Sequence, residues 1–184
     1  MRIVAGAWRG RSLVSPPADV NGTTRPTADR LRQALFDMLM HAHWAGREMV
    51  EDAVVLDAFA GTGALGLEAL SRGARRAVFI ERDRAALAAL RANAASCRAG
   101  DRATVLAMDV LAVPTGEAAS LIFLDPPYRQ GLVPRAIERL GAVGRIAPGA
   151  LLVAETAREE PALPVVALDQ REHGAARLTI WRAG

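Results

Sequence analysis

Residues 54–66, with the sequence VVLDAFAGTGALG, decide the fold of this 184-residue chain. A short apolar run ends at Asp57, a glycine turn follows, and an alanine- and leucine-rich segment begins at Ala64. A buried strand that leads through a tight turn into a helix places backbone N–H groups at the edge of a parallel sheet, where nucleotide-like ligands bind. The stretch therefore predicts a ligand-binding corner in an α/β protein.

The glycines of this turn, Gly61, Gly63 and Gly66, match the pattern G-x-G-x-x-G. Alone the pattern is weak, because it also describes an ordinary β-turn-α corner. The context strengthens it, since the next apolar run, residues 77–80, is followed by Glu81. A carboxylate about 20 residues after the glycines is where a contact to ribose hydroxyls is expected.

Asp57 helps to distinguish between two nucleotide-like ligands. In a dinucleotide site the turn receives a pyrophosphate, which a carboxylate just before the glycines would repel. S-adenosylmethionine (SAM) has no phosphate, and it carries a sulfonium and an α-ammonium group that Asp57 would attract. The turn therefore favours SAM over NAD.

Composition limits the possible classes of protein. The chain is 51% hydrophobic, and its length suits one α/β domain, residues 51–184, with an N-terminal extension of the same domain, residues 1–50. No apolar run approaches the roughly 18 residues of a membrane span, and the first residues lack a signal-peptide pattern. The single Cys97 and three histidines form neither a disulfide framework nor a metal-ligand pattern. We expect a cytoplasmic monomer without membrane or metal.

Positive charge is concentrated at the N-terminus. Six arginines against two aspartates give residues 1–32 a formal charge of +4, whereas the rest of the chain carries −1. Residues 2–14 resemble two short strands around a glycine turn, and there Trp8 lies close to Arg9 and Arg11. Such an aromatic and basic cluster suits stacking on bases and contact with phosphates, although Trp8 could equally pack the hairpin onto the domain.

Strand-like and helix-like segments alternate through the rest of the chain. After a helix that opens at residues 25–30, we expect strands at 54–58, 77–81, 104–108, 121–124 and 150–155, helices at 64–72, 84–95 and 133–140, and a terminal hairpin of 163–168 with 177–181. Strands separated by helices imply a parallel sheet. The prediction is a Rossmann-like, mostly parallel sheet with an antiparallel C-terminal edge, plus an N-terminal hairpin and helix.

Residues 121–128, LIFLDPPY, are the second informative stretch. An apolar strand delivers Asp125 to the carboxyl edge of the sheet, near Asp57 if the two strands flank the switch point. Pro126 and Pro127 stiffen the turn and remove N–H donors, which leaves carbonyl acceptors. A carboxylate, a carbonyl and the Tyr128 ring suit an exocyclic NH₂ group on a planar base.

These segments resemble a known family. An Asp-x-Phe-x-Gly-x-Gly motif with a later Asp-Pro-Pro-Tyr is similar to class I SAM-dependent methyltransferases that act on amino nitrogens. The segments AWRGR at 7–11, RPTADRLRQALF at 25–36 and FAGTGALGLEALSRG at 59–73 resemble the RsmD family in particular, whose members methylate N2 of a guanine in 16S ribosomal RNA. The resemblance covers nearly the whole chain.

The resemblance, taken with the residue patterns, implies three sets of site residues. The expected catalytic set is Asp125, Pro126, Pro127 and Tyr128. The expected SAM-binding set is Asp57, Phe59, Gly61, Gly63, Glu81, Arg82, Asp109 and Val110. The expected RNA-binding set is Trp8, Arg9, Arg11, Arg25 and Arg30. The partner implied is 16S ribosomal RNA in a small-subunit assembly.

Three other functions remain open from the sequence. An adenine-N6 DNA methyltransferase would use the same Asp125 motif, although 184 residues leave no room for a separate sequence-reading domain. An NAD-dependent oxidoreductase would leave Asp57 and the Asp125 motif unexplained. The third possibility is a ribosome assembly factor that keeps the fold without turnover. Only a methyl-transfer assay would distinguish it from an enzyme.

Overall fold

The computed structural model describes residues 1–16 and 25–184, and of residues 25–28 it describes the backbone alone. Seven strands form one sheet: β1 (Val54–Asp57), β2 (Arg76–Glu81), β3 (Ala103–Ala107), β4 (Ala119–Leu124), β5 (Ile146–Ala157), β6 (Asp169–His173) and β7 (Ala176–Arg182). The α-helices are α1 (Arg25–His41), α2 (Ala64–Ser71), α3 (Arg84–Ser96) and α4 (Leu132–Ala142). Short 3₁₀ helices are η1 (Gly6–Trp8), η3 (Arg47–Met49), η4 (Gly100–Arg102) and η5 (Val110–Ala112).

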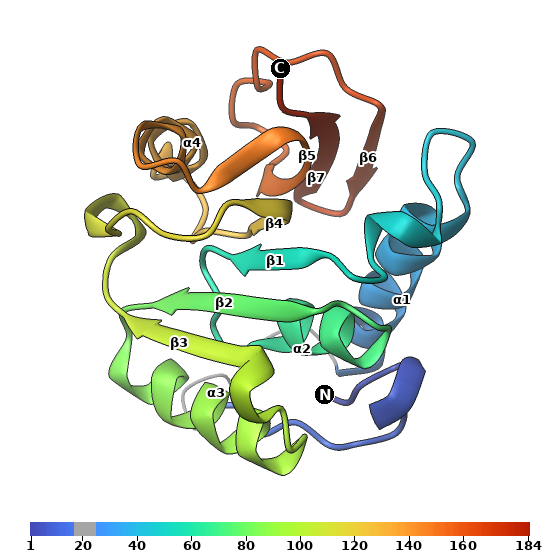
Figure 1. The fold of residues 1–184 in the computed structure, drawn as a ribbon. Helices are drawn as coiled ribbons and strands as arrows, with labels where there is room; N and C mark the ends of the chain where they lie inside the picture. The colour runs from blue at the N-terminus through green and yellow to red at the C-terminus, as the bar shows by residue number, and fades with distance from the viewer. Residues whose placement is uncertain (17–24) are drawn as a thin grey trace.

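The strand order is β3-β2-β1-β4-β5-β7-β6. β1 to β5 pair in parallel, and β7 is antiparallel to both of its neighbours (Figure 1). This is the predicted Rossmann-like sheet with an antiparallel C-terminal edge. The strand order runs from β1 to β3 toward one edge of the sheet and then from β4 to β5 toward the other. Ligands of such sheets bind at the switch point between β1 and β4.

The two faces of the sheet have separate cores. Side chains of neighbouring positions on a strand point to opposite faces, so Val55 packs with α1 and α2 whereas Leu56 packs with α4 and η5. Strands buried on both faces are typical of parallel sheets. Apolar residues of the 1–50 segment, such as Ile3 and Leu39, belong to the same core as α2.

Three predictions of local structure need correction. In place of two regular N-terminal strands, the structure has one antiparallel bridge, Arg2 with Ser12, around η1. The hairpin itself is present, since the Ile3 N–H donates to the Arg11 carbonyl and the Leu13 N–H to the Met1 carbonyl, both at 2.9 Å. The left-handed Gly6 of its turn lies so close to the Ser71 carbonyl that a Cβ atom would be 1.8 Å away from it. The spacing of Leu31, Leu35 and Leu39 predicts one buried face on the helix that opens at residues 25–30. Leu35 and Leu39 are buried, whereas Leu31 is exposed.

The third correction concerns the C-terminal hairpin. The partner of β7 is β6 at residues 169–173, whereas residues 163–168 form no strand. Pro164 cannot donate to a sheet ladder, and Leu163 and Val165 instead pack onto the core on the α4 face. β6 is a polar, mostly exposed edge strand, so it lacks the apolar alternation that marks a strand in sequence.

Within the residues that the structure describes, no helix combines the length and apolar character needed to cross a membrane. In the same residues, no three His, Cys, Asp or Glu side chains are grouped as metal ligands.

Candidate active site

Two aspartates lie at the carboxyl ends of the neighbouring strands β1 and β4. Asp57 is level with Phe123, so Asp125 lies two residues further along the adjacent strand. The Asp57 side chain is only 1% exposed and accepts a hydrogen bond of 3.0 Å from the backbone N–H of Gly66. The structure therefore places both predicted carboxylates at the switch point of the sheet.

Each glycine of the turn after β1 is required for a different structural reason. A Cβ atom on Gly66 would lie 2.3 Å from the Phe79 ring, and one on Gly63 would lie 2.3 Å from Leu90. Packing against the Phe79 ring requires glycine at position 66, whereas Gly63 also has a left-handed φ of 79°, which disfavours a side chain. Gly61 has a left-handed φ of 52° and faces open space, so it leaves room above the turn.

Glu81 is held rigidly at the end of β2. Its carboxylate accepts hydrogen bonds of 2.7 Å from the backbone N–H groups of Gly61, Arg82 and Asp83. A carboxylate has about four acceptor positions, so one is left for a further donor. The contact with Gly61 also connects the glycine turn to β2.

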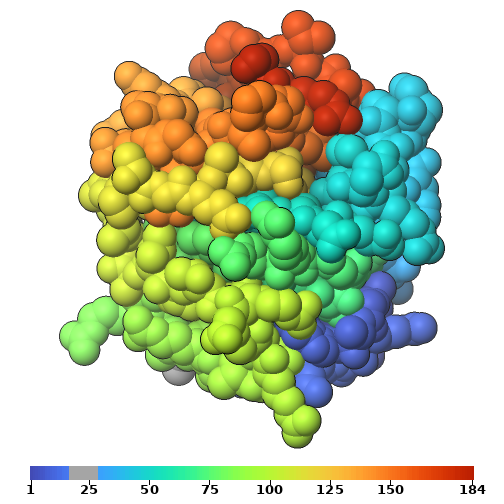
Figure 2. Space-filling view, viewed as in Figure 1, coloured from blue at the N-terminus to red at the C-terminus, as the bar shows by residue number. Residues whose placement is uncertain are grey.

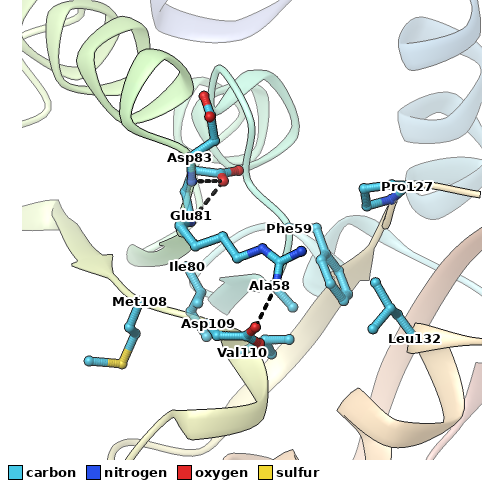
Figure 3. Close-up of a pocket in the computed structure, with 11 residues that line it drawn as sticks. Ala58, Phe59, Ile80, Glu81, Asp83, Met108, Asp109, Val110, Pro127 and Leu132 are labelled. Carbon is cyan, nitrogen blue, oxygen red and sulfur yellow. Dashed lines mark hydrogen bonds and ion pairs between the residues drawn. The ribbon is translucent and has the colours of Figure 1, made fainter. Parts of the chain in front are cut away.

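A first cavity of about 540 Å³ opens beside Glu81 (Figure 3). Glu81 and Asp83 lie on one side of it, Pro127 and Leu132 on the other, and Phe59 projects between the two sides. Other lining residues are Ala58, Ile80, Arg82, Met108, Asp109 and Val110. The cavity is therefore apolar in its walls and carries carboxylates at its rim.

Asp109 and Arg82 form an ion pair of 2.7 Å at the rim of this cavity. Asp109 also accepts a 2.9 Å hydrogen bond from the backbone N–H of Leu111 and so caps η5. This backbone bond, and then the neighbouring Arg82 guanidinium, hold the pKa of Asp109 below its ordinary value. Asp109 is therefore an ionised acceptor at neutral pH.

A second cavity of about 500 Å³ lies on the other side of the Asp125 turn. It is bounded by α1, by the ends of β4 and β5 and by the β6–β7 turn, and its lining includes Asp125, Glu155, Leu35, Met38 and His173. Pro127, two residues after Asp125, lines the first cavity. The Asp-Pro-Pro-Tyr turn thus separates the two cavities and contributes to both.

The site carries more negative charge than the sequence predicted. Glu155 on β5 accepts a hydrogen bond from the Tyr128 hydroxyl, whose side chain is 41% exposed. Glu155 was not among the predicted site residues. The only sequence signal for it is a carboxylate inside the otherwise apolar run 150–157, because parallel pairing of β5 with β4 is what brings it to Asp125.

The pKa values of both aspartates are raised, although only Asp57 is buried. Desolvation raises the pKa of Asp57 to about 7, against the opposing Gly66 hydrogen bond and with a smaller contribution from the charge of Glu81. Asp125 is exposed where it lines the second cavity, and the surrounding protein atoms, followed by the charges of Glu155 and Asp57, raise its pKa to about 8. The site therefore favours binding of positive charge and of N–H donors.

The tip of the predicted RNA-binding arm, residues 4–11, lies away from both cavities, whereas Met1 lines the second cavity and accepts a hydrogen bond of 3.8 Å from the Thr62 hydroxyl of the glycine turn. The Trp8 backbone N–H donates to the Ser71 hydroxyl, the Trp8 ring lies 5.1 Å from the Arg102 guanidinium carbon, and Arg11 donates to the Ser96 carbonyl. Ser71 and Ser96 end helices α2 and α3, so these contacts are at the edge opposite the carboxyl ends of the strands. In Figure 1 the dark blue N-terminal segment lies on the right, whereas the β1 to β3 arrows point left.

The space-filling view places the dark blue arm on the surface beside the yellow-green segment near residue 100 (Figure 2). Arg9 and Arg30 are exposed and form no ion pair with another described residue. The side chain of Arg25 lies outside the described residues. RNA contact by the arm stays a prediction.

Comparison with known proteins gives the family. A model of the family described as Conserved hypothetical protein 95 matches residues 1–182. Ribosomal RNA small subunit methyltransferase D of Escherichia coli K12 is 44% identical over 168 residues, which cover 90% of this chain and 79% of the relative. This chain belongs to the RsmD family. The protein of the same name from Haemophilus influenzae is 36% identical over 166 residues, covering 88% and 81% of the two chains.

A solved structure of the RsmD type agrees with the fold. The Escherichia coli protein yhhF, described as a candidate methyltransferase, superposes with a TM-score of 0.83 at 36% identity, covering 99% of this chain and 97% of that one. The match includes the N-terminal arm and α1 as well as the sheet, since it extends over almost the whole chain.

Two of the segments that resemble the RsmD family meet in a buried ion network. Glu68 on α2 is fully buried and accepts hydrogen bonds from the backbone N–H groups of Val4 (2.8 Å) and Ala5 (3.0 Å). It also pairs with Arg72 (2.8 Å) and with Arg32 of α1 (3.4 Å). This network holds the N-terminal arm and α1 against α2.

Proposed function

We propose that this protein transfers a methyl group from SAM to the exocyclic N2 amino group of a guanine in small-subunit ribosomal RNA. The observation that carries the proposal is the Asp-Pro-Pro-Tyr turn between the two cavities, which leaves one cavity for a methyl donor and the other for a base. The ribosomal RNA part rests on the names of the relatives, 44% and 36% identical to this chain.

The first cavity has the shape and chemistry for the nucleoside part of SAM. Its volume of about 540 Å³ is within the range of small-molecule sites. Glu81 has an acceptor position left for ribose hydroxyls, and Phe59 and Val110 provide apolar walls for a flat ring. The ionised Asp109 at the rim can accept from an amino group, and Asp57 below the turn would balance a positive charge.

SAM, when bound, supplies an electrophilic methyl group on a positively charged sulfur. The residues of the chain then have to present a nitrogen lone pair to that methyl group. Asp125 and the Pro126 carbonyl accept the two N–H groups of the amine, and this orients its lone pair. Positioning of this kind accounts for most of the rate when the leaving group is already good.

Asp125 also stabilises the charge that develops on the amine and accepts its proton. The nitrogen becomes cationic as its new bond to carbon forms, and the Asp125 carboxylate stabilises that charge. The raised pKa of Asp125, about 8, makes it a stronger base than an ordinary carboxylate, so we propose that it takes the proton. Tyr128, partly exposed beside it, stacks on the base.

The base reaches Asp125 through the second cavity. The amino group of a stacked, paired guanine is out of reach, so the nucleotide has to be turned out of its helix. An amino-accepting site alone does not distinguish guanine from adenine, which keeps adenine-N6 transfer as a second outcome of the test below.

Methyl transfer from labelled SAM to small-subunit ribosomal RNA, free and in assembled subunits, tests the proposal. Nucleoside mass spectrometry of the product identifies the methylated base. N2-methylguanosine is the expected product, whereas N6-methyladenosine or the absence of any transfer would overturn the proposal. A protein that binds S-adenosylhomocysteine but transfers nothing would instead be an assembly factor.

The pH dependence of SAM binding follows from Asp57. A bound cation favours the carboxylate, so below a pKa of about 7 binding has to release the Asp57 proton. We expect SAM affinity to rise with pH between 6 and 8, by at most about tenfold per unit for one proton. Calorimetry in buffers of different ionisation enthalpy measures the protons released. The same dependence in Asp57→Asn would contradict this assignment.

The arm gives a prediction for RNA binding. Residues 1–32 carry +4, and the exposed Arg9 and Arg30 have no ion-pair partner among the described residues. We propose that they contact RNA phosphates, so the double variant R9A/R30A should bind RNA more weakly, with a salt dependence shallower by about one unit of slope per contact. Its affinity for S-adenosylhomocysteine should not change.

Arg47→Ala is the matched control for the arm, because Arg47 is an exposed arginine outside residues 1–32 that pairs with Glu51. Filter binding at several salt concentrations gives the slopes. If R9A/R30A and Arg47→Ala have the same slope as the unaltered protein, the arm does not contact RNA through these residues.

A further inference from the structure

Glu155 and Asp125 are neighbours at the ends of two parallel strands. Leu124 and Ala154 are partners in the β4–β5 register, so the next residue of each strand lies at the same level, on strands about 4.8 Å apart. Leu124 and Ala154 both pack on the α4 face. Because side chains alternate, Asp125 and Glu155 both point to the opposite face, where they line the second cavity.

Within the part of the chain that the structure describes, Glu155 forms no ion pair, unlike Glu159 and Glu172 nearby. Glu159 and Glu172 form ion pairs with Arg129 and Arg158. Among the described residues, the hydrogen-bond donor to the Glu155 carboxylate is the Tyr128 hydroxyl, which donates to Oε1. The second oxygen, Oε2, is therefore available to a donor that enters the cavity.

The two carboxylates together match one nucleobase edge. Guanine presents its N1–H and its N2 amino group side by side as donors, whereas adenine presents an amino donor beside the unprotonated acceptor N1. Donors that enter the cavity favour the ionised form of Asp125, and ionised carboxylates only accept hydrogen bonds. Two of them can accept from both groups of guanine, but one of them would face the N1 lone pair of adenine.

We propose that Glu155 is a specificity-determining residue that selects guanine, by accepting N1–H through Oε2 while Asp125 accepts from the N2 amino group. This inference rests on the proposed function, because it places the target amine at Asp125. The Tyr128 hydroxyl occupies Oε1 of Glu155, which leaves Oε2 for a donor that enters the cavity. The repulsion between Asp125 and Glu155 is relieved when the donors of guanine enter.

The test compares guanine with 2-aminopurine at the methylated position of small-subunit ribosomal RNA. 2-Aminopurine keeps the 2-amino group but has an unprotonated N1, so Glu155 would meet a lone pair. Single-turnover rates with both RNAs are measured for the unaltered protein, for Glu155→Gln and for Glu159→Gln. Glu159 is an exposed glutamate close in sequence that pairs with Arg129, which makes its variant the matched control.

The unaltered protein should prefer guanine by about 10⁴-fold, the scale at which a site built for a donor rejects an analogue that lacks it. A glutamine at position 155 can donate to N1, so the preference for guanine in Glu155→Gln should fall at least about tenfold. Because 2-aminopurine also lacks O6, the change in this ratio between the proteins is the deciding measurement. Glu159→Gln should leave the ratio unchanged.

An unchanged ratio in Glu155→Gln would overturn the role of Glu155 while guanine methylation by the unaltered protein still supports the proposed function. No transfer to guanine by the unaltered protein would instead overturn the proposed function itself. S-adenosylhomocysteine affinity, measured for each variant, shows that the site is folded. If a variant binds S-adenosylhomocysteine normally but transfers no methyl group, its affinities for the guanine RNA and the 2-aminopurine RNA are measured instead. In Glu155→Gln the affinity for the guanine RNA should no longer exceed that for the 2-aminopurine RNA.

Discussion

Replacing Asp125 with asparagine is expected to lower the rate of methyl transfer about 10³-fold while S-adenosylhomocysteine still binds. The estimate combines loss of a general base with loss of the charge that stabilises the developing cation. Asparagine keeps the size of the side chain and one acceptor oxygen, but it cannot take the proton. Because Asp125 lines the second cavity and not the first, the loss should fall on the chemical step.

Single-turnover kinetics and calorimetry on the same preparation separate the two effects. Asp101→Asn is a matched control, since Asp101 is an exposed aspartate on η4 outside both cavities. A fall in S-adenosylhomocysteine affinity as large as the fall in rate would show that Asp125 serves binding of the methyl donor and that the assignment is wrong.

Replacing Glu68 with alanine is expected to destabilise the protein by about 3–5 kcal/mol, the cost of breaking a buried ion pair by removing one partner. Glu68 is fully buried and accepts from two backbone N–H groups and two arginines. Without it, Arg32 and Arg72 remain buried with part of their charge unbalanced. For a chain of this length, each kcal/mol lowers the melting temperature by roughly 2–4 °C.

Thermal and urea unfolding followed by circular dichroism measure this loss, and hydrogen exchange shows which part opens. We expect faster exchange at Val4 and Ala5, whose N–H groups lose their acceptor. Glu51→Ala removes an exposed pair with Arg47 and should cost less than about 1 kcal/mol. If the two variants are equally stable, the network does not hold the arm.

The sequence by itself determined the central part of the fold and the ligand-binding corner. The apolar runs before Asp57, Glu81 and Asp125 are short-range signals, and each is long enough to specify a buried strand without reference to the rest of the chain. Glycine at positions 61 and 63 follows from left-handed backbone geometry, which is also local, whereas Gly66 is required by its contact with Phe79 on β2. The parallel order then follows from helices between strands.

Only the tertiary structure decided which residues meet. Glu155 joins Asp125 because β5 pairs with β4 in one particular register, and an isolated carboxylate in an apolar run does not specify that register. The tip of the arm lies at the amino edge of the sheet because Glu68, Ser71 and Ser96 hold it there, although its charge suggested only contact with RNA. β6 forms on an exposed edge, where no buried face imposes a pattern. For Glu155 and the arm, the deciding interaction joins residues far apart in the chain, so the local pattern of residue types could not reveal it.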